Sequence, residues 1–115
     1  METILQRLTE LDEITGAIIV GKDGLVVSGA LHSDDEEMLG AMSAAIFGSI
    51  VDYTTQTNNS ELRHVIIETS SGTVQFAEVG ELILVVTTSS NTNPGRVRLE
   101  IKKACHQLSQ AVAAY

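Results

Sequence analysis

The stretch from Met38 to Tyr53 constrains the fold most, because Asp52 is its only charged residue. Its apolar periodicity predicts a helix that begins near Ser33 and ends near Thr57. At about 3.6 residues per turn, we expect one apolar stripe to face a sheet: Leu39, Met42, Ile46, Ile50 and Tyr53. The opposite side is also small or apolar: Gly40, Ala41, Ala44, Phe47, Gly48 and Val51. A helix that is apolar all round is normally buried all round, so this pattern predicts a second molecule as the cover.

The expected cover is another copy of the same chain. Gly40, Ala44 and Gly48 are four residues apart in sequence, and such small side chains allow two helix backbones to approach closely. A symmetric pair uses the same patch on both copies, and an edge strand over 62–69 would pair across the two-fold axis. The predicted dimer interface consists of Gly40, Ala44, Phe47, Gly48, Val51, Leu62 and Val65.

Before and after this helix, the pattern predicts short strands and two terminal helices. An apolar stripe predicts a helix over 1–14. The β-branched run 16–21, the turn 22–24 and the run 25–27 predict a hairpin, in which Gly24 supplies the positive φ. Further strands are expected over 62–69, 73–79 and 82–88. A last helix begins at Pro94, with Asn93 as its cap.

The predicted element order is therefore α-β-β-α-β-β-β-α, in a single domain over 1–115. Every link between consecutive strands is tight, which favours an α+β fold with a five-stranded antiparallel sheet. The strands over 16–21 and 82–88 are apolar on both faces, as central strands are. We expect the helix over 33–57 on one face and the two terminal helices on the other.

Composition excludes several classes of protein. The chain has 15 acidic and 7 basic residues, for a net charge of −8, which argues against binding to nucleic acid or to an anionic membrane. No apolar run is long enough to span a bilayer, and no secretory signal is visible, so we expect a cytoplasmic protein. Cys105 is the only cysteine, and we expect a buried, unreactive thiol on the last helix.

The sequence contains no convincing catalytic or metal-binding motif. Residues 16–22 match the start of a P-loop, but Asp23 follows where the magnesium ligand Ser or Thr is required. The three histidines, His32, His64 and His106, are far apart, and the acidic run 34–37 is explained by helix capping. We therefore predict a protein that is not an enzyme and needs neither metal nor cofactor.

Four of the seven basic residues lie within eight positions: Arg96, Arg98, Lys102 and Lys103. Two interpretations remain open for them. They form either a solvated rim that offsets the acidic surface or a binding surface for an acidic partner.

Taken together, the element order, the hairpin sequence over 16–27, the Ala-rich middle helix and the segments 64–69 and 79–86 resemble the Roadblock family. That family includes dynein light chains and bacterial MglB-like regulators. The resemblance implies a dimer without a catalytic centre, whose paired second helices form a platform for a Ras-like small GTPase. MglB-like members promote GTP hydrolysis without inserting an arginine, and the middle helix here contains no Arg or Lys. They commonly carry an extra C-terminal segment, whereas this sequence ends at Tyr115, which makes an exchange-factor role doubtful.

By position, the resemblance places the GTPase-binding face between the two apolar stripes of the middle helix, on Met38, Ala41, Ala45, Ser49 and Asp52. Two alternatives remain open. One is a small-molecule sensor of the PAS or GAF type, which the scarcity of aromatic and convergent polar residues disfavours. The other is an architectural adaptor that joins larger chains.

Overall fold

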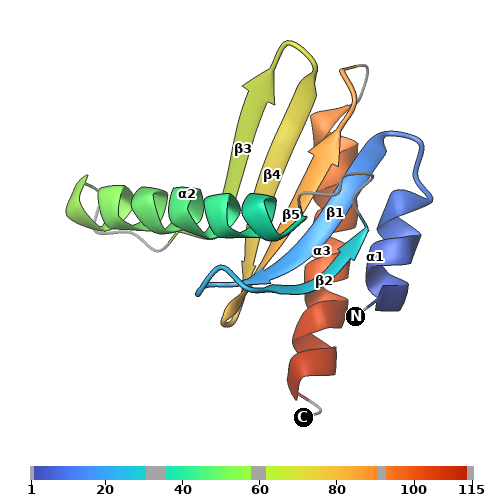
Figure 1. The fold of residues 1–115 in the computed structure, drawn as a ribbon. Coiled ribbons are helices and arrows are strands. Elements are labelled where there is room, and N and C mark those ends of the chain that lie inside the picture. Colours follow the sequence, from blue (N-terminus) through green and yellow to red (C-terminus); the bar gives the residue numbers. More distant parts are fainter. Residues whose placement is uncertain (1, 31–35, 58–61, 91–92, 114–115) are drawn as a thin grey trace.

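The computed structural model describes residues 2–30, 36–57, 62–90 and 93–113, and Figure 1 shows their arrangement. Three helices and five strands follow the predicted order. In chain order they are α1 (Glu2–Thr9), β1 (Ile14–Gly21), β2 (Val26–Ala30), α2 (Glu36–Thr57), β3 (His64–Thr69), β4 (Gly72–Val79), β5 (Leu82–Thr88) and α3 (Pro94–Ala113).

The strands form one five-stranded sheet in the order β2-β1-β5-β4-β3, and all neighbouring pairs are antiparallel. β1 and β5 are interior strands, as their continuous apolar sequences predict. Gly24 adopts φ 92° in the turn between β1 and β2, where the Leu25 amide donates to Asp23 Oδ1 at 3.1 Å. The predicted hairpin and its glycine are therefore confirmed.

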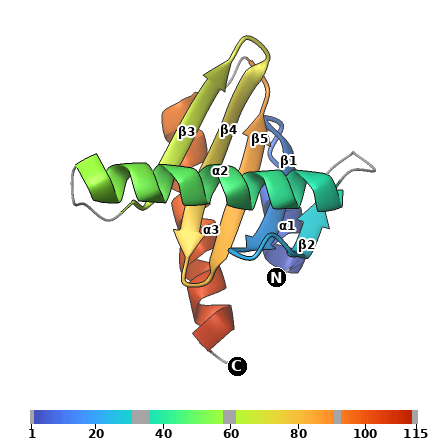
Figure 2. The ribbon, with the colours of Figure 1, turned by 60° about the vertical axis from the view of Figure 1, so that its left-hand side comes forward.

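Helices cover both faces of the sheet, as Figures 1 and 2 show. α1 and α3 pack on one face over a closed aliphatic core, in which Leu5, Leu84, Ile101 and Leu108 are buried. α2 alone lies across the strands on the other face (Figure 2). Its core is smaller and is centred on Phe47, Phe76 and Ile83. The predicted α+β layering is confirmed.

Several element boundaries differ from those that the sequence predicts. The first helix ends at Thr9, where the side-chain hydroxyl donates to the Leu5 carbonyl at 3.1 Å, whereas Ile14 begins β1 opposite Thr88. β2 extends to Ala30, further than the expected run 25–27. The Asn93 cap is confirmed, since its Oδ1 accepts from the Gly95 amide at 3.0 Å.

Some predictions concern parts of the chain outside the described residues. These are the cap at Ser33, the residues at 34–35 of the acidic run, the position of His32 and the turn at 58–60.

The orientation predicted for the middle helix is wrong. Gly40, Ser43 and Phe47 face the sheet and are buried, and Phe47 is only 2% exposed. The stripe that we expected against the sheet lies at the side of the helix, where Met42 is 51% exposed and Tyr53 is 69% exposed. The predicted sheet-facing stripe is therefore turned to the side of the helix, and the buried face is centred on Gly40, Ser43 and Phe47.

Close packing explains why the small side faces the sheet. A methyl group at Gly40 would lie 2.6 Å from Val26 Cγ2 and 3.4 Å from the Gly24 carbonyl oxygen. Only glycine allows the helix to approach the turn between β1 and β2 this closely. Glycine at this position therefore serves packing within the protomer, and Gly40 and Phe47 are not available to a dimer interface.

Candidate functional site

The outer surface of α2 is a continuous exposed stripe. It contains all the residues that were predicted to contact a GTPase: Met38, Ala41, Ala45, Ser49 and Asp52. They lie on the side of the helix opposite Phe47, since successive residues turn by about 100°. The stripe is small and weakly polar, with Asp52 as its only charge. Such a surface allows another backbone to approach closely.

Next to this stripe, one flank of α2 is apolar and exposed. This apolar flank consists of Leu39, Met42, Ile46 and Tyr53, each more than one-third exposed. It borders an open groove of about 210 Å³ between the helix and the sheet. Strands β3, β4 and β5 contribute Ile67, Val74 and Val85 to the floor of the groove. Exposed apolar side chains beside an apolar groove are typical of a surface that binds another protein.

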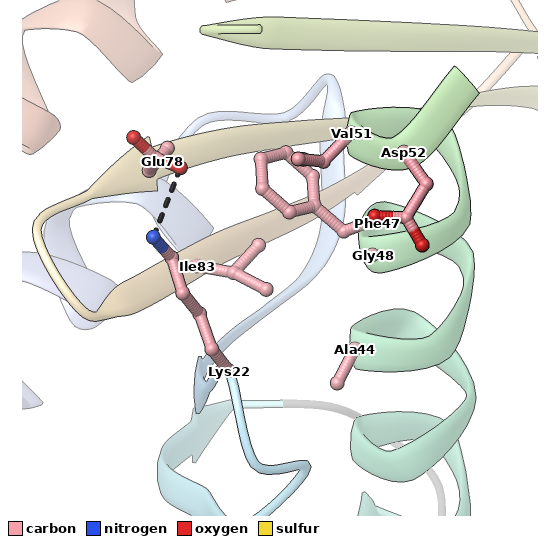
Figure 3. Close-up of a pocket in the computed structure, with 8 residues that line it drawn as sticks. All are labelled: Lys22, Ala44, Phe47, Gly48, Val51, Asp52, Glu78 and Ile83. Carbon is pink, nitrogen blue, oxygen red and sulfur yellow. Dashed lines mark ion pairs between the residues drawn. The ribbon is translucent and has the colours of Figure 1, made fainter. Parts of the chain in front are cut away.

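The opposite flank of α2 borders a more polar pocket of about 220 Å³, shown in Figure 3. Lys22 and Glu78 form an ion pair of 3.1 Å across it, and the Phe47 ring lies on its apolar side near Ile83. The Asp52 carboxylate also lines the pocket and forms no ion pair with the described residues. A Cβ atom at Gly48 would have no neighbour within 4 Å, so this flank has room for a contacting side chain.

β3 forms an edge of the sheet. It pairs with β4 on one side, and no other described strand pairs with its opposite side. Val65 points to the α2 face and is half-buried against the Phe47 cluster, as is Leu62 just before the strand. An unpaired edge presents free backbone donors and acceptors to a neighbouring chain. The edge strand also reaches the apolar flank of α2, because Ile67 of β3 lines the same groove as Met42.

No group of three or more His, Cys, Asp or Glu side chains that could hold a metal occurs within the described ranges. Burial raises the pKa of Cys105 to about 11, so its thiol stays protonated at neutral pH. The apparent P-loop is an ordinary strand, because its residues 16–21 pair with β5 and cannot cradle a phosphate. Among the helices described, none is both long and apolar enough to cross a membrane.

Comparison with known proteins agrees with this architecture. The sequence model of the Roadblock/LC7 domain family matches residues 1–88. The chain belongs to the Roadblock/LC7 family. It is 34% identical over 109 residues to an uncharacterised protein of Methanocaldococcus jannaschii, covering 94% of this chain and 92% of that one. Two further proteins of that archaeon match at the same identity, with 96% of their length covered.

Solved structures extend the likeness to the whole Roadblock/LC7 fold. Myxococcus xanthus MglB superposes with a TM-score of 0.93 at 24% identity, covering 99% of this chain and 95% of that one. A Roadblock/LC7 domain of Streptomyces avermitilis gives a TM-score of 0.90 at 16% identity, with 98% of both chains covered. At these identities the likeness shows the fold that this Roadblock/LC7 chain shares with them.

Sequence reasoning placed the outer stripe of α2 correctly on the surface, but it assigned the apolar stripe that contains Met42 and Ile46 to the sheet, whereas these side chains are exposed. The missed signal is the spacing of Gly40, Ser43 and Phe47, which is the spacing of one helix face. Gly40 and Ser43 are small, and Phe47 adds an aromatic ring on the same helix face. This combination indicates close packing of the helix on a sheet. The exposed apolar flank follows from this orientation of α2.

Proposed function

We propose that two copies of this chain form a dimer and that their paired α2 helices make a docking platform for a Ras-like small GTPase. The observation that carries the proposal is the exposed apolar flank of α2 beside its open groove. The family supports it, because Roadblock resemblance implies a dimeric regulator or scaffold of such GTPases. The chain itself supplies no catalytic group in this proposal.

In the proposed dimer, the apolar flank replaces part of the interface predicted from sequence. Met42 and Ile46 of each copy would pack in the groove of the other, while the β3 edges pair across the two-fold axis. Ala44, Gly48 and Val51 lie toward the opposite, more polar flank. Leu62 and Val65 remain in the proposed interface because they lie at the β3 edge.

The outer stripes of two α2 helices would then lie side by side and form one platform. Ala41, Ala45 and Ser49 are small enough for close approach by switch segments of a GTPase. Asp52 supplies a charge that can pair with a basic residue of the partner. Since α2 contains no Arg or Lys, any stimulation of GTP hydrolysis would act by arranging the GTPase's own residues.

The groove favours a protein partner over a small metabolite. Its lining is almost entirely aliphatic or aromatic, with Ser43 and Thr87 as the polar residues. Small-molecule sites usually place several convergent polar groups around the ligand to fix its orientation. This lining therefore supports the interface proposal and disfavours the sensor alternative.

The test is binding to a small GTPase encoded in the same genome, loaded either with GDP or with a non-hydrolysable GTP analogue. Gel filtration of the mixture should show a complex that forms preferentially with one nucleotide state. Failure of every such GTPase to bind in both states would refute the regulatory role. Binding to a long peptide of a larger assembly in that case would favour the architectural adaptor.

A further inference from the structure

A second surface lies on the other face of the sheet, where α3 borders the edge strand β3. Arg98 and Lys102 are one helical turn apart on this flank, and both are exposed. Neither forms an ion pair or hydrogen bond with any residue that the structure describes. Their neighbours on the opposite flank are engaged: Arg96 pairs with Glu13 at 3.0 Å and Lys103 with Glu100 at 3.4 Å. The basic cluster therefore divides into a paired half and an unpaired half.

The unpaired half faces His64 at the start of β3. His64 is half-buried, and its Nε2 lies 2.8 Å from Oε1 of Gln75. Burial lowers the pKa of His64, the hydrogen bond to Gln75 opposes this shift in part, and the positive charges of Arg98 and Lys102 add to the lowering. The imidazole is therefore neutral at neutral pH and lies in the positive field of both side chains.

Gln75 determines which nitrogen of His64 carries the proton. Its side chain is 0% exposed, and its amide nitrogen has no hydrogen-bond partner in this arrangement. The amide oxygen that faces Nε2 can only accept, so Nε2 carries the proton of the neutral ring and donates it to Gln75. This hydrogen bond fixes the imidazole beside Arg98 and Lys102.

We propose that Arg98 and Lys102, which lie beside the neutral imidazole of His64, bind carboxylates of an acidic protein segment. Charge complementarity favours this occupant, because these two cationic side chains lie together and pair with none of the described residues. Exposed apolar side chains border the site, with Ile66 on β3 and Leu99 on α3. The partner that fits is a segment in which Asp or Glu alternates with aliphatic residues.

Protein carboxylates fit this site better than a phosphate-rich surface does. Nucleic acids and anionic membranes present extended arrays of negative charge, which the acidic remainder of the chain repels. A short acidic segment requires only local contact. The charged side chains of the site, Arg98 and Lys102, belong to α3 on the face opposite α2, whereas His64 and Ile66 belong to the β3 edge that the proposed dimer pairs.

Fluorescence anisotropy measures binding of the chain to a labelled peptide of alternating Glu and Leu residues. The control peptide has Gln in place of each Glu. The intact chain should bind the acidic peptide and not the neutral one. The double variant Arg98→Glu, Lys102→Glu should weaken binding by more than about tenfold. The matched control is Arg96→Glu, Lys103→Glu, which makes the same charge change on the same helix and should weaken binding less than about threefold.

His64→Gln is the control for the imidazole, because it keeps an amide donor and leaves the charge at neutral pH unchanged. We expect it to weaken binding less than about threefold, since the proposal assigns the carboxylate contacts to Arg98 and Lys102. Thermal unfolding of each variant checks that the fold is intact. Equal losses from the two double variants, no binding of the acidic peptide, or tighter binding to phosphatidylserine vesicles or an oligonucleotide would overturn the proposal.

Discussion

The two faces of the sheet differ in how completely helices cover their apolar side chains. On the face covered by α1 and α3, thirteen described residues form a closed aliphatic core. On the face covered by α2 alone, six described residues form the core, and side chains such as Met42 and Tyr53 remain exposed. The strands contribute seven residues to the first core and five to the second, whereas the helices contribute six and one, so most of the difference comes from the helices.

The number of covering helices explains the difference. Two helices packed side by side exclude water from the first face, whereas a single helix that crosses the strands leaves the sheet open beside it (Figure 2). The open side is also where the helix carries its exposed apolar flank. The first face therefore stabilises the protomer, whereas the second retains the exposed apolar surface through which we propose that the chain assembles.

The largest effect is expected from a cavity in the closed face. Leu108 of α3 is fully buried, so Leu108→Ala should lower the free energy of unfolding by about 2–5 kcal/mol. Leu99→Ala on the exposed side of the same helix should cost less than about 0.5 kcal/mol. Urea denaturation measures both. Similar losses for the two variants would show that this face is not the principal core.

A charge on the apolar flank tests the open face. In the proposed dimer, Met42→Glu buries a carboxylate near its copy across the two-fold axis, and the dissociation constant should rise at least about a hundredfold. Sedimentation equilibrium measures this, and circular dichroism should show an intact protomer. The control is Leu99→Glu, which places the same charge on a similarly exposed apolar position of α3. An unchanged association constant for Met42→Glu would remove the flank from the interface.

A bulky charge on the outer stripe should separate docking from dimerisation. Ala45→Arg leaves the apolar flank and the sheet contacts untouched, and we expect it to weaken GTPase binding by at least about tenfold. Gln107→Arg on α3 is the control for the added charge. Gel filtration of the mixtures measures GTPase binding. The mass of each variant measured alone shows whether it still forms a dimer. Retained binding by Ala45→Arg would place the GTPase elsewhere.

The smallest effect concerns pH. Because the pKa of His64 is lowered in the folded protein, the unfolded chain takes up the proton first as the pH falls below the ordinary value of 6.5. Stability is therefore complete above that value and declines between it and the lowered pKa. Urea denaturation from pH 8 to 5 should show a smaller decline for His64→Gln than for the wild type. An identical decline in the two proteins would show that His64 is not the group responsible.

Much of the fold follows from local chemistry in the sequence. Gly24 after Asp23 specifies a turn whatever surrounds it, and Asn93 before Pro94 specifies the start of a helix, so these predictions are confirmed. The interior position of β1 and β5 follows from apolar residues on both of their faces. These features depend on neighbours in the chain, which the sequence displays directly.

The orientation of α2 could not be predicted in the same way. Its sides differ little in hydrophobicity, so periodicity alone does not decide which side is buried. Which side of α2 faces the sheet depends on residues that are far away in the sequence. The turn between β1 and β2 leaves room only for Gly40, and the sheet accommodates the ring of Phe47. The unpaired charges of Arg98 and Lys102 likewise emerge only when α3 is placed beside β3.

Sedimentation equilibrium of the wild-type chain at micromolar concentration tests the central claim most directly. If the open face is completed by a second copy, the measured mass should be twice the 12.3 kDa of one chain. A mass of one chain throughout the micromolar range would contradict the account, because the apolar flank of α2 would then be exposed to water.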